Sequence, residues 1–127
     1  MQKLRVLVVD DSPTFLKAAA AVLMDVAGIE IVGLASSGAE ALDLAALTAP
    51  DLVLTDLVMP AMDGLELTRR LVQAPNPPMV AIMTSQTQPQ YRSAAALAGA
   101  TEFVPKADLT LELPAILQRL LENIAMQ

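Results

Sequence analysis

The sequence predicts an α/β domain built on a doubly wound, five-stranded parallel sheet. Short apolar runs alternate with amphipathic stretches about three helical turns long, the pattern of repeated strand–helix units. Hydrophobic residues make up 54% of the 127 residues, which is enough to bury a core of domain size. The units follow one another without a linker, so we expect one domain spanning residues 1–127.

Each strand is expected where a short apolar run ends in polar or turn residues. The first run, Leu4–Val9, has four consecutive apolar residues, which is typical of a strand buried on both faces of a parallel sheet. The runs are Leu4–Val9, Ile29–Ala35, Leu52–Thr55, Met79–Met83 and Glu102–Val104.

The first two helices are expected from their capping residues. Ser12 offers an N-cap hydroxyl and Pro13 suits the first helical position, so a helix follows and runs through residue 26, with Gly28 ending it. Ser37 and Glu40 form a capping box that opens the second helix, which stops before residue 50.

The remaining helices are predicted in the same way. Asp63 caps the third, and Pro89 can start a fourth that ends at Gly99. Pro114 fits only the first turn of a helix, so the last helix is expected to begin near Leu111 or to be kinked at the proline.

Composition excludes several kinds of chemistry. The chain has no Cys and no His, which removes disulfides, thiolate or imidazole metal sites, a Cys nucleophile and a His base. Eight Lys and Arg against fourteen Asp and Glu give a net charge of -6, which argues against direct nucleic-acid binding. The exposed arginines, Arg69, Arg70 and Arg92, are most simply solvated helix faces.

Targeting signals are also not expected. The residues before the first strand lead into too short an apolar run for a signal peptide. The longest apolar run, Ala18–Met24, is far shorter than the roughly 20 residues that span a bilayer. We therefore expect a cytoplasmic protein without a membrane partner.

Polar residues follow the predicted strands at one edge of the sheet. They are Asp10 and Asp11, Asp56, Thr84 and Lys106. In the flavodoxin-like strand order 2-1-3-4-5, the first and third strands are neighbours at the switch point where ligands bind. Because neighbouring strands lie about 4.8 Å apart, the three aspartates can share one site.

Three clustered carboxylates need a compensating cation. At about 4 Å and an effective dielectric near 20, each pair costs on the order of 4 kcal/mol. Oxygen ligands without His or Cys suit a hard ion, most simply Mg²⁺. With Lys106 and the Thr84 hydroxyl beside it, such a site suits a phosphoryl group whose phosphorus is attacked by a carboxylate.

The sequence resembles the receiver domain of two-component response regulators over almost the whole chain. Six segments in the right order and spacing carry the resemblance, which is highly specific because all six are present. They are Val6–Ser12, Gly38–Leu42, Pro50–Asp56, Met59–Gly64, Thr84–Ser85 and Lys106.

The resemblance implies a role for each residue around the aspartates. Asp56 would accept a phosphoryl group from a sensor histidine kinase or a phosphotransfer protein. Asp11 would bind Mg²⁺ directly and Asp10 directly or through water, with Asp56 and the backbone carbonyl of Val58 completing the protein ligands. Thr84 would turn toward a phosphoryl oxygen.

The same resemblance implies which residues and which surface of the domain change on phosphorylation. Lys106 would pair with the phosphoryl group, and the ring of Phe103 would move inward on activation. Contacts with a downstream protein would then change on the face formed by the fourth helix, the fifth strand and the fifth helix. A phosphorylation-dependent dimer is a further expectation, and the domain would catalyse only its own phosphorylation and dephosphorylation.

The sequence departs from the family at a few positions. Ala107 stands where many members have a cis-proline, so the loop after the fifth strand is expected to differ. Phe103 lacks the hydroxyl of the Tyr found in other members. Val58 and Gln86 occupy positions that influence the lifetime of the phosphoryl group, and their effects on an attacking water oppose each other.

Two other function classes compete with the switch. A phosphohydrolase of the haloacid-dehalogenase class would need a second Asp two residues after the nucleophile, where this chain has Val58. An interaction module that works without phosphorylation would not need all five site residues. The chain is either a complete single-domain regulator or the receiver of a longer protein, and the resemblance assigns no output.

Overall fold

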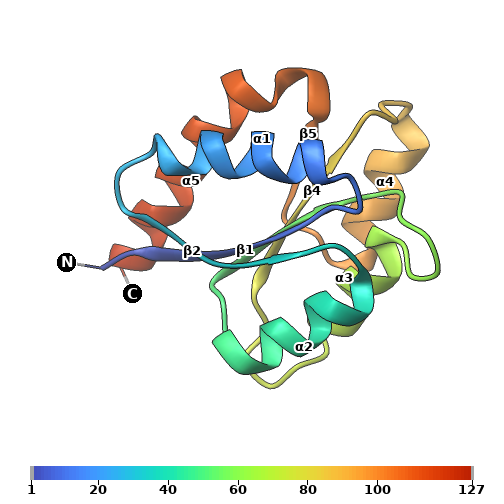
Figure 1. Cartoon of the computed structure of the whole chain (residues 1–127), viewed down its shortest axis with the longest axis horizontal. Coiled ribbons are helices and arrows are strands. Elements are labelled where there is room, and N and C mark those ends of the chain that lie inside the picture. Colours follow the sequence, from blue (N-terminus) through green and yellow to red (C-terminus); the bar gives the residue numbers. More distant parts are fainter. Residues whose placement is uncertain (1, 127) are drawn as a thin grey trace.

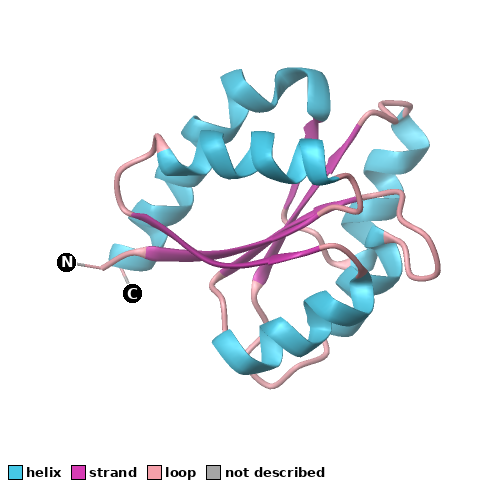
Figure 2. Cartoon of the chain, viewed as in Figure 1, coloured by secondary structure: helices cyan, strands magenta, loops and turns pink. Residues whose placement is uncertain are grey.

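The computed structural model describes residues 2–126 and contains one five-stranded parallel sheet. The strand order is β2-β1-β3-β4-β5, which confirms the predicted topology. The strands are β1 (Leu4–Val9), β2 (Ile29–Ala35), β3 (Leu52–Asp56), β4 (Met79–Thr84) and β5 (Glu102–Pro105). Figures 1 and 2 show the sheet as the middle layer between two layers of helices.

Helices cover both faces of this sheet, as expected for a doubly wound fold. The helices α1 (Pro13–Met24) and α5 (Leu109–Ala125) lie together on one face (Figure 1). The other face carries α2 (Gly38–Thr48), α3 (Gly64–Leu71) and α4 (Pro89–Ala98). A 3₁₀ turn, Lys106–Asp108, joins β5 to α5.

The alternation of side chains along each strand divides the core in two. Val6 and Val8 of β1 belong to the apolar cluster beneath α1 and α5, whereas Leu7 and Val9 belong to the cluster beneath the other helices. All four side chains have no exposed surface, which is the pattern of a central strand covered on both faces.

The predicted N-terminal caps are confirmed, but the capping box of α2 is only half formed, because the Glu40 carboxylate accepts from the Ser36 amide, at 2.6 Å, rather than from the Ser37 amide. The hydroxyl of Ser12 accepts from the Phe15 amide at 3.3 Å, and that of Ser37 accepts from the Glu40 amide at 3.1 Å. Asp63 caps α3 through the Glu66 amide at 2.9 Å. These bonds satisfy backbone donors that the first helical turn leaves unpaired.

The ends of two helices differ from the prediction. The helix α1 ends at Met24, before the predicted end at Val26, because its last turn tightens: the Asp25 amide bonds the Val22 carbonyl at 3.3 Å. Gly28, with φ of 87°, does not cap that helix but turns the chain into β2.

The last helix begins earlier than predicted. It starts at Leu109 rather than near Leu111, so Pro114 lies inside it. The preceding 3₁₀ turn winds directly into α5, and the proline leaves the Thr110 carbonyl without its usual helical donor.

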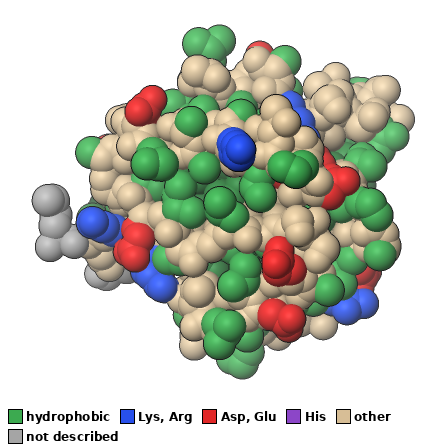
Figure 3. Space-filling model, in the orientation of Figure 1, with side chains coloured by type: hydrophobic (Ala, Val, Ile, Leu, Met, Phe, Trp, Pro, Cys, Tyr) green, Lys and Arg blue, Asp and Glu red, His purple; other side chains and the backbone are tan. Residues whose placement is uncertain are grey.

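The surface mixes apolar and charged side chains. On the face that Figure 3 draws, acidic and basic side chains are scattered between hydrophobic ones. None of the helices that the structure describes combines the length and the hydrophobicity that a bilayer crossing requires.

Candidate functional site

Three aspartates meet at the carboxyl end of the sheet, where β1 and β3 are neighbours. Asp10 follows β1 directly, Asp11 comes next, and Asp56 is the last residue of β3. One carboxylate oxygen from each lies within 4.8 Å of the others. Asp10 is 0% and Asp56 6% exposed, whereas Asp11 is exposed. The predicted acidic cluster therefore forms, with two members buried and one open to solvent.

Lys106, which directly follows the edge strand β5, lies against this cluster. Its ammonium Nζ donates to Oδ2 of Asp10 at 3.0 Å and lies 3.3 Å from Oδ1 of Asp56. The other oxygen of Asp10, Oδ1, accepts from the Ser12 amide at 2.9 Å. The buried carboxylate of Asp10 thus has a partner for each oxygen, which compensates for its loss of water.

The surroundings of Asp56 raise the pKa of its carboxyl above the ordinary value. Burial raises the pKa of the Asp56 carboxyl, and the neighbouring carboxylate of Asp10 raises it further. The Lys106 ammonium and the Leu57 amide lower that pKa and offset part of this effect. The charged form of Asp56 is therefore held at a cost in free energy, which a further cation at the cluster would reduce.

Thr84 ends β4, the strand beside β3. Its side chain is 1% exposed, and the hydroxyl oxygen accepts from the Gln86 amide at 2.9 Å. Because this bond uses the oxygen as acceptor, the hydroxyl proton remains available for donation. In the register of the sheet, Asp56 pairs with Met83, so Thr84 stands one residue beyond the level of Asp56.

Backbone hydrogen bonds fix the loop that follows Asp56. The Leu57 amide bonds the Met83 carbonyl at 3.1 Å, and the Gly64 amide bonds the Leu57 carbonyl at 2.7 Å. The side chain of Val58 between them is 59% exposed. The position two residues after Asp56 thus carries an apolar side chain in solvent rather than the acid that a phosphohydrolase of the haloacid-dehalogenase class requires.

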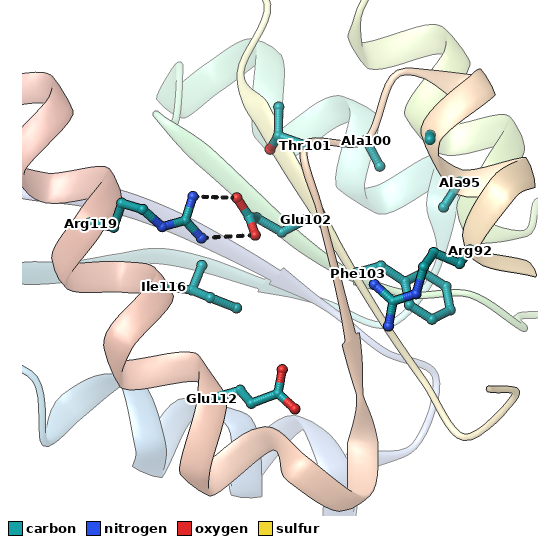
Figure 4. Close-up of a pocket in the computed structure, with 10 residues that line it drawn as sticks. Arg92, Ala95, Ala100, Thr101, Glu102, Phe103, Glu112, Ile116 and Arg119 are labelled. Atoms are coloured by element: carbon teal, nitrogen blue, oxygen red, sulfur yellow. Dashed lines mark hydrogen bonds and ion pairs between the residues drawn. The ribbon is translucent and has the colours of Figure 1, made fainter. Parts of the chain in front are cut away.

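Phe103 lies on β5, away from the acidic edge. Its half-buried ring has the guanidinium of Arg92, on α4, 4.7 Å from its centroid. Both side chains line a shallow cavity of about 420 Å³ between α4, β5 and α5 (Figure 4). Across it, Arg119 of α5 forms two 3.0 Å bonds to Glu102. The exposed Arg92 thus has an aromatic contact that the prediction of a solvated helix face did not include.

Phe15 is a neighbour of the site that the sequence does not predict. Nζ of Lys106 lies 4.0 Å from the centroid of the Phe15 ring. An apolar residue in the first turn of a helix is ordinarily read as core, and the ring does pack on the cluster beneath α1 and α5. The signal was its position: Ser12 and Pro13 start α1 at the edge where Lys106 also arrives.

The donor set fits a hard divalent cation. The ligand atoms that the cluster offers are carboxylate oxygens, which Mg²⁺ prefers over nitrogen and sulfur. The raised pKa of Asp56 agrees with this fit, because burial and the neighbouring Asp10 carboxylate disfavour its charged form even with Lys106 in place.

Comparison with protein families and with known proteins finds similarity over most of this chain. Residues 6–118 match the response regulator receiver domain family. A protein-glutamate methylesterase/protein-glutamine glutaminase of Myxococcus xanthus is 42% identical over 104 residues, covering 81% of this chain and 30% of that protein. A putative transcriptional regulator of Pseudomonas aeruginosa is 38% identical over 109 residues, covering 86% of this chain and 52% of that protein. The chain thus spans a third to a half of the length of these relatives.

Solved structures agree in fold. The signal receiver domain of the putative response regulator NarL from Mycobacterium tuberculosis superposes with a TM-score of 0.89 at 29% identity, covering 96% of this chain and 98% of that one. The response regulator domain of Thermotoga maritima CheB gives a TM-score of 0.86 at 23% identity, covering 95% and 98%.

Proposed function

Because the chain belongs to the response regulator receiver domain family, we propose that it is a phosphorylation switch with Asp56 as the phosphoacceptor. The observation that carries the proposal is the grouping of Asp10, Asp11, Asp56 and Lys106 at one edge of the sheet. This arrangement combines a nucleophilic carboxylate with groups that neutralise phosphoryl oxygens.

The reaction is a phosphoryl transfer to a carboxylate oxygen of Asp56. The proposed donor is a phosphohistidine of a sensor kinase or of a phosphotransfer protein. Because this chain has no His, that phosphohistidine belongs to another protein. A bond forms between the oxygen and phosphorus, and the bond from phosphorus to the donor nitrogen breaks. The bonding electrons leave with the imidazole, so no other co-reactant is needed. The domain turns over no outside substrate.

Lys106 and Thr84 stabilise the transferred group. The ammonium of Lys106 already lies 3.3 Å from Oδ1 of Asp56, so it can pair with a phosphoryl oxygen after a small movement. The hydroxyl of Thr84 has its proton available and can donate to a second oxygen once it turns toward Asp56. Both contacts strengthen as negative charge arrives at the site.

Asp10, Asp11 and Asp56 would hold Mg²⁺, together with the backbone carbonyl of Val58. When bound, the ion would neutralise phosphoryl oxygens and the excess negative charge of the cluster. The exposed Asp11 leaves the cluster open to solvent, which suits an ion that keeps several water ligands.

The switch would act through the face formed by α4, β5 and α5. Phosphorylation would draw Thr84 toward the site and let the Phe103 ring move inward, which would change the cavity beside Arg92. A downstream protein, or a second copy of the chain, would recognise this altered face. Because the two relatives have different names, a methylesterase and a transcriptional regulator, and this chain covers only 30% and 52% of them, we propose that it corresponds to a switch that they share.

The first test is intact-mass analysis after incubation with acetyl phosphate and Mg²⁺. We expect one added phosphoryl group on the native chain, and none with EDTA or in Asp56→Asn. An unchanged mass calls for beryllofluoride binding, because fast hydrolysis can prevent trapping. A chain that takes up neither group, and whose stability does not respond to Mg²⁺, would contradict the switch and favour a phosphorylation-independent interaction module.

A further inference from the structure

We propose that Phe15 is a positioning residue for phosphoryl transfer, which holds the Lys106 ammonium against its aromatic face beside Asp10 and Asp56. The observation that carries the inference is the 4.0 Å separation between Nζ of Lys106 and the centroid of the Phe15 ring. The inference rests on the proposed function, since it concerns the reaction at Asp56.

The ring supplies a third contact for the ammonium. A lysine ammonium has three N–H donors, and the carboxylates of Asp10 and Asp56 lie 3.0 and 3.3 Å away. The face of an aromatic ring carries partial negative charge and attracts a cation within about 6 Å of its centroid. The ammonium is therefore held by two carboxylates and one ring rather than by the carboxylates alone.

The chain segment that carries Phe15 is itself well held. The Ser12 hydroxyl accepts from the Phe15 amide at 3.3 Å, and the Ser12 amide donates to Asp10 at 2.9 Å. Pro13 restricts the backbone at the first position of α1. The ring is half-buried and packs on the apolar cluster beneath α1 and α5. One turn of chain thus fixes both the buried carboxylate and the ring that Lys106 contacts.

This contact matters because a lysine side chain is long and flexible. Its four-carbon stem loses much rotational freedom when the ammonium is fixed at one place. The contact with the ring offsets part of this entropy cost before the phosphoryl group arrives. The ammonium is therefore already in place to pair with the phosphoryl group. Without the ring, we expect phosphorylation of Asp56 to be slower by about two- to fivefold, the range of a cation–π contact near the surface.

The contact itself can be observed by NMR without any reaction. The chain has three lysines, Lys3, Lys17 and Lys106, so lysine labelled isotopically at Cε gives a spectrum with few signals. Protons held over a ring are shielded, so we expect one Cε–H signal shifted upfield, and we expect Lys106→Met to remove it. Phe15→Leu should return that signal to the position of an exposed lysine. The matched change Phe103→Leu should leave it in place.

The consequence for the reaction is measured by the initial rate of mass gain with acetyl phosphate. Phe15→Leu should be slower by about two- to fivefold. A trifluorinated phenylalanine at position 15 keeps the shape of the ring but withdraws electrons from its face, and it should give an intermediate rate. A residue that only fills space would show the native rate with the fluorinated ring, and this result would overturn the proposal.

The remaining outcomes separate this inference from the proposed function. A native spectrum without a shielded lysine signal would overturn the contact. A shielded signal that Phe15→Leu removes with no change in rate would overturn the positioning role. If native Asp56 takes up neither phosphoryl nor beryllofluoride and Mg²⁺ does not change the stability of the chain, the proposed function fails, and the positioning role fails with it although the NMR contact persists.

Discussion

Gly64 lies directly against the backbone carbonyl of Asp56, and the structure leaves no room there for a side chain. A Cβ at Gly64 would collide with that carbonyl oxygen and lie 3.0 Å from Cα of Leu57. Since the obstacles are backbone atoms of the segment that carries Asp56, they cannot move aside without displacing the proposed phosphoacceptor. The glycine thus connects the start of α3 to the geometry of the site.

We expect Gly64→Ala to destabilise the fold by about 1–3 kcal/mol, the usual cost of overpacking, and to slow phosphorylation of Asp56. Urea unfolding and intact mass measure the two effects. Gly33→Ala is the matched control, because the atoms nearest to its Cβ, at 3.1 and 3.4 Å, are side-chain ends of Leu7 and Leu44. Equal effects of the two substitutions would contradict this view.

Removing Lys106 should leave the carboxylates of Asp10 and Asp56 without their cation. We expect Lys106→Met to lower the free energy of unfolding by about 3 kcal/mol in EDTA, at the lower end of the range for a broken buried ion pair. The low end applies because the lysine side chain keeps 18% of its surface exposed. Adding Asp10→Asn should recover part of the loss. A double variant no more stable than Lys106→Met would count against coupling between the two residues.

Stability should depend on pH through Asp56. The pKa of its carboxyl is raised in the folded chain, so the folded state holds the proton more tightly than the unfolded state. Stability from this group is therefore lost as pH rises from the ordinary pKa of 3.8 through the raised value. We expect Asp56→Asn to increase Tm at neutral pH in EDTA, and the increase to shrink toward pH 4. A gain that is independent of pH would point to another cause.

Mg²⁺ should stabilise the native chain through Asp11. This side chain is exposed, so Asp11→Asn should hardly change Tm in EDTA. At Mg²⁺ about tenfold above its dissociation constant, linkage predicts about 1.4 kcal/mol of stabilisation for the native chain and little for Asp11→Asn. Thermal scans with and without Mg²⁺ measure the difference. An equal response of both proteins would exclude Asp11 as a ligand.

The contact between Arg92 and Phe103 should be measurable by a double-mutant cycle. Arg92→Gln and Phe103→Leu, alone and combined, should show a coupling of about 0.5–1 kcal/mol in urea unfolding. If Phe103 moves on activation, beryllofluoride should reduce this coupling. Additive effects without beryllofluoride would mean that the ring and the guanidinium do not interact in solution.

Much of the fold followed from local patterns. The apolar runs located the strands to within a residue. The central strands β1, β3 and β4 are buried almost throughout and are therefore apolar along most of their length, whereas the edge strands β2 and β5 are only partly buried. Ser12, Ser37 and Asp63 located helix starts, since a cap acts within one turn of chain. The ends of α1 and α5 were less accurate, because the last and first turns depend on packing and on tighter hydrogen bonding.

The grouping of Asp10, Asp11, Asp56, Thr84 and Lys106 was also predicted from the sequence alone, for a topological reason: crossover helices bring the carboxyl ends of all parallel strands to one edge. Contacts within that edge were decided only by the tertiary structure. The sequence does not show that Phe15 meets Lys106 or that Arg92 lies over Phe103. Phe15 and Lys106 lie far apart in the chain, and Arg92 and Phe103 belong to different elements, α4 and β5. Both distances depend on how the helices pack on the sheet. Sequence thus determined which groups share the site, and packing decided how each is held.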